Sequence, residues 1–210
     1  MPPTQVPDMV VARLPLYLRT LEYLQRQGVE LISSAQLAEL AGVSPAQIRK
    51  DLSHFGRFGK QGTGYDVLHL RRELIRILGL DRQWPMALVG LGALGQAIMH
   101  YGGFKERGFH IAAVFDSDPD KIGKQIGDLV VMPPERIPHE LPKRQIQIGI
   151  VAVPPEAAQS VANLLVRSGV RAILNYAPIT LSAPPEVHVE QIDPVVHLQH
   201  MVYYLRHCPQ

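Results

Sequence analysis

The chain has 210 residues, of which 46% are hydrophobic and 19% charged, and it contains one cysteine, Cys208. This apolar fraction is typical of chains that bury a core, so collagen-like and low-complexity chains are excluded. One cysteine forms neither an intramolecular disulfide nor a cysteine zinc site, which fits a reducing cytosol. The longest weakly polar stretch, Met86 to Met99, is shorter than the ~20 apolar residues that a bilayer span needs. We therefore expect a cytoplasmic protein without a membrane partner.

Charge is spread unevenly along the chain. Residues 1–79 carry a net charge of +3 and residues 80–210 a net charge of −1. Within residues 44–76, seven Lys and Arg residues stand against three Asp and Glu residues, which gives a local charge of +4. Such a basic patch is compatible with phosphate contacts and equally with a solvated helix face.

The first 80 residues predict helices. An apolar stripe from Tyr17 to Leu24 indicates a first helix, with Pro15 near its start and Gly28 closing it. At the other end of this region, an amphipathic helix is predicted over Val67–Leu78.

Start signals mark a second and a third helix. Ser33-x-x-Gln36 is a possible capping box for a helix that runs to Gly42. Ser44-Pro45-Ala46-Gln47 combines an N-cap serine, a proline at the first helical position and a glutamine at the third. A turn of about three residues then joins the two helices, which is the spacing of a helix-turn-helix. A helical hairpin with a solvated face is the alternative.

The third helix separates apolar from polar side chains. Ile48, Leu52 and Phe55 form one apolar stripe. The residues expected off this stripe are Gln47, Arg49, Lys50, Ser53 and His54. A recognition helix needs such a face, because some side chains must reach base edges while others hold phosphates.

Residues 55–65 predict a β-hairpin. They carry four glycines and three aromatic residues, with Arg57 and Lys60 between them. Glycines permit a tight turn. A basic hairpin tip of this kind enters a minor groove in the wing of a winged helix.

A strand, a glycine-rich turn and a helix follow the seam at residues 80–85, where Pro85 disfavours helix in the residue before it. The strand from Met86 runs into a G-x-G-x-x-G motif whose residues are Gly90, Leu91, Gly92, Ala93, Leu94 and Gly95. In this context the first glycine allows the turn, the second lets a pyrophosphate approach the backbone, and the third lets the helix pack on the strand. We expect these residues to bind a dinucleotide.

Asp116 follows a second strand, Ile111–Phe115, and lies 24 residues after Gly92. A carboxylate at this spacing accepts a hydrogen bond from the adenosine ribose and repels a 2′-phosphate, so NAD(H) is favoured over NADP(H). The alternative is a turn or cap residue ahead of Asp118-Pro119.

Later segments indicate a parallel, doubly wound sheet. Strands are predicted at residues 146–153, 172–175 and 187–189, with a helix at 156–167. Ligands of such sheets lie at the carboxyl ends of the strands. The residues we expect near the cofactor are Val153, Pro154, Asn175, Tyr176 and Ala177.

The last predicted helix, Val195–Arg206, has apolar side chains around more than half of its circumference. A partner subunit would cover the second side, and a two-fold dimer suits a reader of palindromic DNA. The alternative is a helix packed wholly on its own domain.

Taken together, these motifs resemble those of the Rex family of bacterial redox-sensing transcriptional repressors. The resemblance covers nearly the whole chain. It is carried by Gln47-Ile-Arg49-Lys50-Asp51-Leu52-Ser53, Phe55-Gly-x-Phe-Gly-x-x-Gly-x-Gly64-Tyr65, Val89-Gly-x-Gly-x-Leu-Gly95, Phe115-Asp116-x-Asp118-Pro119 and Ala172-Ile-Leu-Asn175-Tyr-Ala-Pro178. It implies a winged-helix DNA-binding domain over residues 1–80, a Rossmann NAD(H)-binding domain over 85–193 and a C-terminal dimerisation helix over 194–210.

The resemblance also implies a mechanism. A homodimer would bind a palindromic double-stranded operator when NADH is scarce and leave it when NADH binds, while NAD+ competes for the pocket without causing release. No metal and no catalytic residue are expected. By resemblance, Arg49, Lys50 and Asp51 contact DNA.

Other residues follow from the same resemblance. The wing enters the minor groove, where the family usually has arginine at the position of Gln61, so Lys60 or Arg57 would supply the charge. The switch region maps onto three residues, Arg13, Tyr101 and Asp193, with the terminal helix exchanged between subunits. The chain also departs from the family pattern at Pro15, and at Pro194, where an apolar or aromatic side chain is expected.

An NAD-dependent dehydrogenase with a helical appendage is the competing hypothesis. It needs a proton-transfer residue beside the nicotinamide and a substrate pocket. The sequence offers Tyr176, His188 and His197 for the first and no clear substrate domain for the second.

Overall fold

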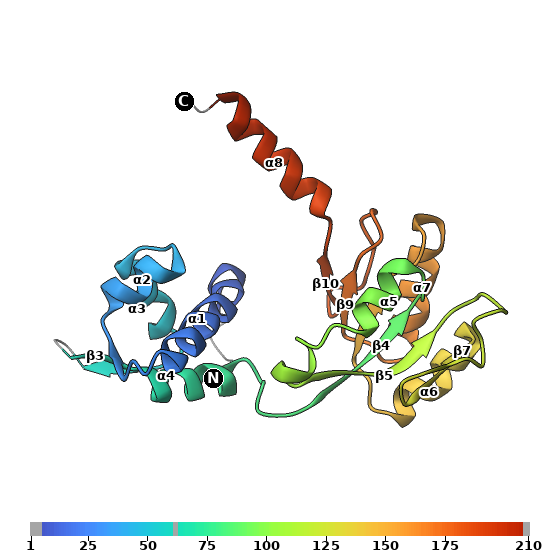
Figure 1. Ribbon diagram of the computed structural model, residues 1–210, viewed down its shortest axis with the longest axis horizontal. Helices are drawn as coiled ribbons and strands as arrows, with labels where there is room; N and C mark the ends of the chain where they lie inside the picture. Colours follow the sequence, from blue (N-terminus) through green and yellow to red (C-terminus); the bar gives the residue numbers. More distant parts are fainter. Residues whose placement is uncertain (1–5, 61–62, 208–210) are drawn as a thin grey trace. The chain divides into compact units, whose positions relative to one another are not determined.

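The computed structural model describes residues 6–60 and 63–207. It divides into two compact units, and the boundary along the chain lies between Arg82 and Gln83. This division lies within the seam expected at residues 80–85. The two units are described one after the other (Figure 1).

The first unit combines helices with a small antiparallel sheet. Its helices are α1 (Asp8–Arg26), α2 (Ser34–Ala41), α3 (Pro45–Ser53) and α4 (Val67–Ile77), and its strands are β1 (Leu31–Ile32), β2 (Gly59–Lys60) and β3 (Gly64–Asp66). The strand order is β1-β3-β2. Strands β2 and β3 form the predicted hairpin, so the winged-helix arrangement is confirmed.

The predicted helix starts are confirmed. Ser33 Oγ accepts a hydrogen bond from the Gln36 backbone N–H, and the Gln36 side chain accepts one from the Ser33 backbone N–H, which completes the capping box of α2. Gly42 ends this helix in the left-handed conformation, with φ of 68°. Ser44 caps α3.

Pro15 corrects one expectation. It lies inside α1 rather than near its start, because the helix begins at Asp8. A proline in a helix interior removes one backbone hydrogen bond and costs about 3 kcal/mol. The helix persists because Leu14, Tyr17 and Leu21, on either side of the exposed Pro15, are fully buried in the core of this unit.

A seven-stranded sheet forms the centre of the second unit. Its strands are β4 (Trp84–Val89), β5 (Phe109–Phe115), β6 (Gln125–Ile126), β7 (Leu129–Met132), β8 (Ile148–Val151), β9 (Ala172–Asn175) and β10 (His188–Gln191). They lie in the order β10-β9-β8-β4-β5-β7-β6, and every pair is parallel except β6 with β7. The predicted Rossmann-type parallel sheet is confirmed.

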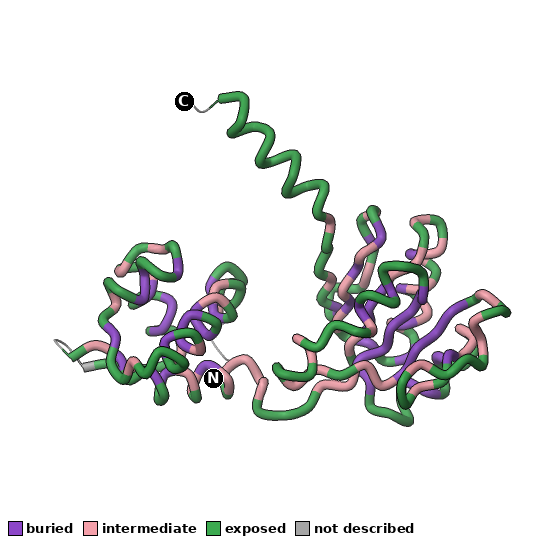
Figure 2. The backbone as a smooth tube through the Cα atoms, viewed as in Figure 1, coloured by how far each residue is buried: buried purple, intermediate pink, exposed green. Residues whose placement is uncertain are grey.

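Helices cover both faces of this sheet. They are α5 (Ala93–Met99), α6 (Ile137–Lys143) and α7 (Pro155–Arg167), with 3₁₀ turns at Lys105–Arg107 and Pro134–Arg136. Alternate residues of β4 point to opposite faces. Val89 packs with Ile137 of α6 and Ala162 of α7, whereas Leu88 packs with Ile98 of α5. The sheet is therefore doubly wound, and its central strands are the most deeply buried part of the unit (Figure 2).

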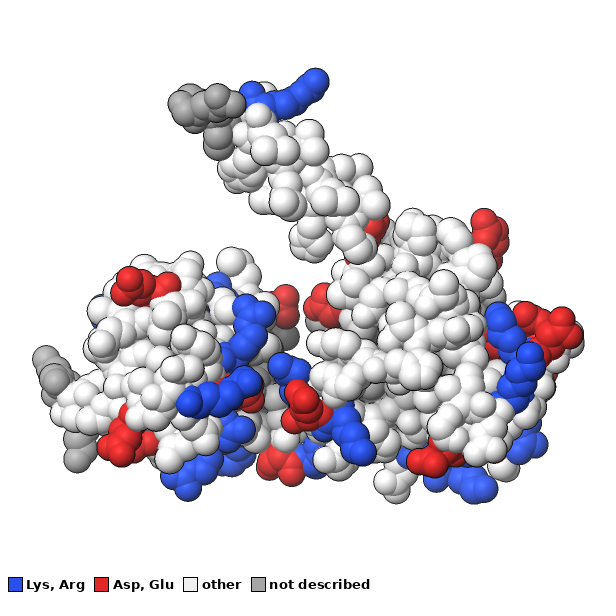
Figure 3. Space-filling view, in the orientation of Figure 1, with Lys and Arg blue, Asp and Glu red and all other residues white. Residues whose placement is uncertain are grey.

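Helix α8 (Pro194–His207) ends the described chain and has no buried residue. Figure 2 shows it exposed along its whole length, and Figure 3 shows it almost without charge until its C-terminal end. Its exposed apolar side chains include Leu198, Met201 and Leu205. The alternative of a helix packed on its own domain is not what the structure has. Among the described residues, no helix is long and apolar enough to cross a membrane.

Candidate nucleic-acid interface and nucleotide-binding site

Helix α3 has one buried side and one exposed side. Ile48 and Leu52 are buried, whereas Arg49 and Lys50 are exposed. The helix start is fixed, because Ser44 Oγ accepts a hydrogen bond from the Gln47 backbone N–H at 3.1 Å. Exposed cations on a short, capped helix are what contact with a DNA duplex requires.

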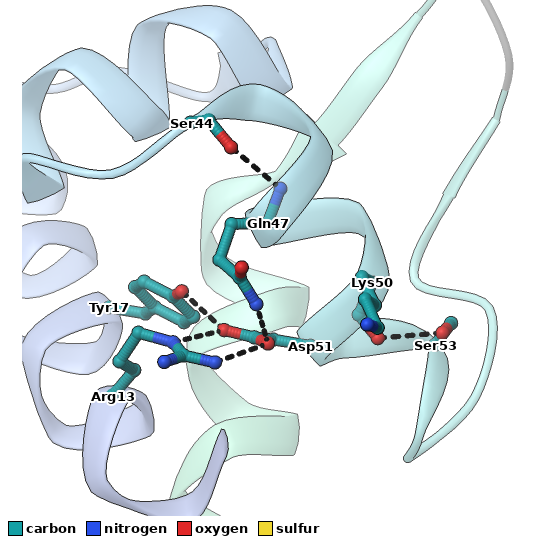
Figure 4. Close-up of polar contacts among 7 residues, drawn as sticks. All are labelled: Arg13, Tyr17, Ser44, Gln47, Lys50, Asp51 and Ser53. Atoms are coloured by element: carbon teal, nitrogen blue, oxygen red, sulfur yellow. Dashed lines mark hydrogen bonds and ion pairs between the residues drawn. The ribbon is translucent and has the colours of Figure 1, made fainter. Parts of the chain in front are cut away.

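Asp51 lies on the buried side of α3 and joins this helix to α1 (Figure 4). Arg13 donates through Nε to Oδ2 at 2.6 Å and through Nη2 to Oδ1 at 2.8 Å. The Tyr17 hydroxyl donates to Oδ2 at 2.6 Å, and Gln47 Nε2 donates to Oδ1 at 2.6 Å. The first two partners come from α1 and the third from α3 itself.

These contacts keep Asp51 ionised. Burial by itself would raise the pKa of this carboxyl, but hydrogen bonds from Arg13, Tyr17 and Gln47 outweigh it and hold the pKa below its ordinary value. Burial and the hydrogen bond to Asp51 raise the pKa of Tyr17 to about 12, so its hydroxyl remains a donor. The hydrogen bond to Asp51 also raises the pKa of Arg13.

The expectation that Asp51 contacts DNA is therefore wrong for this structure. Its side chain is fully buried, and both oxygens are engaged by residues of the same unit. The sequence interpretation also missed the hydroxyl of Tyr17, which it assigned only to an apolar stripe. One signal was available, because Arg13 and Tyr17 are four residues apart and so share one helix face.

A groove of about 620 Å³ separates α3 from the wing hairpin. Arg49 and Arg57 line it together with Ser34, and Arg49 Nη1 donates to Ser34 Oγ at 3.0 Å. Exposed guanidinium groups suit phosphate oxygens. Of Lys60 only the backbone in β2 is described, and Gln61 lies outside the described residues.

In the second unit, the glycines of the turn after β4 differ in what they permit. Gly90 has φ of 96°, and a side chain there would overlap the Ala152 carbonyl. A Cβ at Gly95 would overlap the Gly90 carbonyl oxygen. Gly92, in contrast, has nothing within 4 Å of the place where a Cβ would stand. The first and third glycines serve the packing of the chain, and the second leaves open space that fits a pyrophosphate.

Asp116 stands at the carboxyl end of β5 and faces this turn. Its Oδ2 accepts from the Leu91 backbone N–H at 2.6 Å and from Lys121 Nζ at 3.2 Å, and its Oδ1 accepts from the Asp118 backbone N–H at 2.8 Å. Burial would raise its pKa, but these hydrogen bonds lower it, so the carboxylate is charged. Asp116 thus has the turn role that was the alternative in the sequence, and its contact with a ribose stays a prediction.

The carboxyl ends of β4, β5, β8 and β9 meet at one edge of the sheet. From β4 the chain adds β5 on one side of the sheet and later adds β8 on the other side. The strand order therefore reverses between β4 and β8. Ligands of such sheets bind at this switch point. Val153 and Pro154 follow β8 and the half-buried Tyr176 follows β9, so the structure brings them to the edge that carries the glycine turn.

Asn175 corrects a second expectation. Its side chain is fully buried; Oδ1 accepts from the Ala177 backbone N–H, and Nδ2 donates to the Ile179 carbonyl and to Gln191 Oε1. It fixes the loop after β9 and does not present its amide to a ligand. Ala177 is buried as well, so of the three expected residues in this loop only Tyr176 is accessible.

The three expected switch residues occupy both units. Arg13 belongs to the Asp51 network of the first unit. Tyr101 is exposed and packs edge-on against Phe104, with ring centroids 5.0 Å apart. Burial raises the pKa of Tyr176, and the nearby Tyr101 raises it further. Asp193 accepts a hydrogen bond from the Val195 backbone N–H at 2.9 Å at the start of α8.

Two of the three side chains that the sequence offered for a dehydrogenase are exposed. His188 is exposed beside Glu190 at 2.9 Å, and His197 is exposed on α8. Over residues 6–60 and 63–207, no group of three or more His, Cys, Asp or Glu residues is arranged to hold a metal ion.

Comparisons with known proteins cover nearly the whole chain. Residues 5–53 match the family described as "Putative DNA-binding protein N-terminus", and residues 81–179 match "CoA binding domain". The chain is 54% identical over 199 residues to the redox-sensing transcriptional repressor Rex of Chloroflexus aurantiacus, covering 95% of this chain and 94% of that protein.

The chain is also similar to solved structures of a Rex-family repressor. The crystal structure of RSP, a Rex-family repressor, in complex with beta-NAD+ and operator DNA has a TM-score of 0.91 and 42% sequence identity, covering 96% of this chain and 93% of that chain. The structure of RSP with beta-NADH has a TM-score of 0.87 and 40% identity, covering 96% and 95%.

Proposed function

Since this chain belongs to the Rex family of redox-sensing transcriptional repressors, we propose that it binds operator DNA as a homodimer and leaves the DNA when NADH binds. It is a redox-sensing transcriptional repressor and not an enzyme, and NADH and NAD+ are its nucleotide ligands. One observation carries the proposal: 96% of the chain matches a repressor structure that holds both beta-NAD+ and operator DNA.

On the DNA side, α3 enters the major groove with Arg49 and Lys50 facing outward. Their exposure and the absence of a buried counter-ion on either, within the described residues, support this role. The wing hairpin follows the minor groove, where Arg57 and Lys60 supply the positive charge and Gln61 replaces an arginine. Negative potential in a narrow minor groove favours such cations.

On the nucleotide side, the turn Gly90–Gly95 receives the pyrophosphate at the open position of Gly92. Asp116 accepts from the adenosine ribose, while Val153, Pro154 and Tyr176 border the pocket. NADH and NAD+ compete for this site, and the reduced nicotinamide favours the state that does not bind DNA.

In the proposed dimer, the second subunit covers α8. The apolar side chains of this helix are exposed in one chain, and exchange of the helix between subunits brings it beside the partner's nucleotide pocket. Arg13, Tyr101 and Asp193 form the switch that carries the redox state to α3. The dimer works in the cytoplasm, where operator DNA and the NADH pool are both accessible.

The test is fluorescence anisotropy of a labelled palindromic promoter fragment, with protein titrated at fixed salt and NADH or NAD+ then added. We expect tight binding that NADH releases and an equal concentration of NAD+ does not. The double variant Arg49→Gln/Lys50→Gln loses affinity, and its salt slope falls by about 2, because each lost phosphate contact removes about 0.9.

The matched control, Lys143→Gln/Arg171→Gln, removes two exposed charges from the second unit and keeps both the affinity and the slope. Binding that ignores both nucleotides would contradict the redox function. An unchanged affinity and salt slope in the α3 double variant would contradict the DNA contacts.

A further inference from the structure

The same helix start, Ser-x-x-Gln, occurs at α2 and at α3, and the two glutamines behave differently. In α2, Gln36 Oε1 accepts from the Ser33 backbone N–H at 3.0 Å and from Ser33 Oγ at 2.9 Å. In α3, Ser44 Oγ accepts from the Gln47 backbone N–H, but the Gln47 side chain turns away from Ser44 and donates to Asp51 at 2.6 Å (Figure 4). Helix α3 thus lacks half of its capping box.

Asp51 determines which end of the Gln47 amide faces inward. An ionised carboxylate only accepts hydrogen bonds, so Gln47 must offer its NH₂ group. Turning the amide over would place its oxygen against the carboxylate. Arg13 and Tyr17 hold Asp51 in place from α1, and its side chain is fully buried. The orientation of the amide is therefore set by three other side chains together, those of Asp51, Arg13 and Tyr17.

The amide oxygen of Gln47 is left as an open acceptor. Within residues 6–60 and 63–207 it takes part in no hydrogen bond, and Figure 4 shows it on the side of the amide away from Asp51. Gln47 is the third residue of α3 and half-buried. The N-terminal residues of a recognition helix are the ones that meet base edges.

We propose that Gln47 selects an A·T base pair in each operator half-site and that Asp51 is the positioning residue that sets its amide for adenine. This inference rests on the proposed function, because it needs α3 to enter the major groove. Adenine offers the N6 amino donor beside the N7 acceptor. Gln47 Oε1 accepts from N6, and the amide hydrogen that Asp51 does not use donates to N7.

Guanine is excluded by the same geometry. It presents acceptors at both N7 and O6, so a glutamine must turn its amide over to serve O6. In this chain that rotation would bring the Gln47 oxygen against the Asp51 carboxylate. The specificity thus includes a repulsive element as well as an attractive one.

The experiment begins with selection of bound duplexes from a random pool by the full-length protein, which yields its operator. The affinity for every single base-pair change is then measured at fixed salt. We expect one A·T pair in each half-site that wild type prefers by about 5- to 150-fold and at which Gln47→Met loses the preference. Replacing that adenine by purine, which lacks the 6-amino group, weakens wild type but not Gln47→Met.

Two further variants separate specificity from helix stability. Gln36→Met removes the same side chain from the same position of α2, so it lowers stability but keeps the base ranking. Asp51→Asn lets residue 51 donate as well as accept. In this variant we expect the ratio of the affinities for A·T and G·C at that position to fall toward one. Gln47→Met decides the proposal even where Asp51→Asn fails to fold, because it removes one hydrogen bond to Asp51 and leaves those from Arg13 and Tyr17 in place.

An unchanged base ranking in Gln47→Met would overturn the inference. So would a Gln47→Met protein that loses its preference at a G·C pair and not at an A·T pair. In both cases wild type still selects an operator and releases it with NADH, so the proposed function stands. If wild type selects no operator, both fall together.

Discussion

At the residue scale, Asp116 serves the fold, and the proposed function gives the same carboxylate a ligand. It holds the glycine turn through the Leu91 N–H and the loop after β5 through the Asp118 N–H. An ionised carboxylate has about four acceptor positions. Among the described residues, Oδ1 receives only the Asp118 N–H, so it retains a position for a ribose hydroxyl.

Asp116→Asn should therefore weaken NADH binding, by removing the charge and by setting an NH₂ group against one of the two backbone N–H groups, of Leu91 and Asp118, that the carboxylate accepts. The asparagine keeps the shape but loses the charge, and a hydrogen bond to a charged group contributes about 1.5–3 kcal/mol. We expect the dissociation constant for NADH to rise by at least about tenfold and the relative affinity for NADPH to increase. Titration of NADH fluorescence measures both.

The matched control for this change is Asp128→Asn, at an exposed position of the same unit. It should bind NADH like wild type. If Asp116→Asn also bound NADH like wild type, Asp116 would not belong to the ribose site.

Short-range features of single residues were predictable from the sequence, whereas long-range ones were not. The caps Ser33 and Ser44 lie three residues from their partners, so spacing alone identifies them. Asp51 was placed on the DNA-facing side, because its inward turn depends on Arg13, 38 positions away. Gln47 was predicted to face DNA, but its orientation depends on the same distant contact.

At the element scale, α6 forms although it contains two prolines, and a proline inside a helix disfavours it. It has Pro138 at its second position and Pro142 inside it, and the sequence interpretation did not include it. Glu140 holds it: this nearly buried carboxylate accepts from Arg136 at 3.1 Å and from Arg144 at 3.0 Å. Arg144 also donates to the Ala112 carbonyl of β5 at 2.8 Å, which ties the helix to the sheet.

Removing the charge of Glu140 should destabilise the protein in a pH-dependent way. Hydrogen bonds from Arg144, His139 and Arg136 lower the pKa of Glu140 from 4.5 to about 2. A folded-state pKa below the unfolded value gives stability that is complete above pH 4.5 and is lost as the pH falls toward 2. Glu140→Gln should therefore cost about 2 kcal/mol at pH 7 and progressively less below pH 4.5.

Urea unfolding at several pH values measures this difference. Glu135→Gln, at an exposed position in the preceding turn, is the control and should cost little at any pH. A cost for Glu140→Gln that stays the same down to the acid limit would show that the charge of Glu140 does not hold α6.

Some short strands were predicted, and others were missed. The strand of residues 172–175 was placed correctly because it is a continuous apolar run before a turn. Strands β6 and β7 are two and four residues long and depend on pairing with each other and with β5. Such pairing leaves no period in the sequence, so only the folded sheet reveals these strands.

At the scale of the whole molecule, assembly determines whether the parts can act together. A ligand must prefer one state by about 10⁴-fold, or about 5.5 kcal/mol, to move a population from 1:99 to 99:1. Two nucleotide sites in one dimer would share that requirement. We therefore expect release from DNA to be steeper in NADH concentration for a dimer than for a single chain.

A charge placed on the apolar side of α8 should separate the subunits. Met201 is exposed in one chain and would be buried between two. Met201→Glu should shift the protein from dimer to monomer at micromolar concentration, because an unpaired charge in a buried interface costs several kcal/mol. Sedimentation velocity measures this, and operator affinity should fall with it.

Gln199→Glu adds the same charge to the same helix at a polar position and should remain dimeric. A Met201→Glu protein that sedimented like wild type would show that α8 lies outside the subunit contact.

The exposure of α8 also bears on gene dosage. A helix of fourteen residues without a buried side chain is marginal in water, so in the proposed dimer the second chain would order this helix by covering it. In such a dimer the concentration of competent repressor would rise with the square of the chain's abundance at low expression, so a cell that makes little of it would respond weakly to its own redox state.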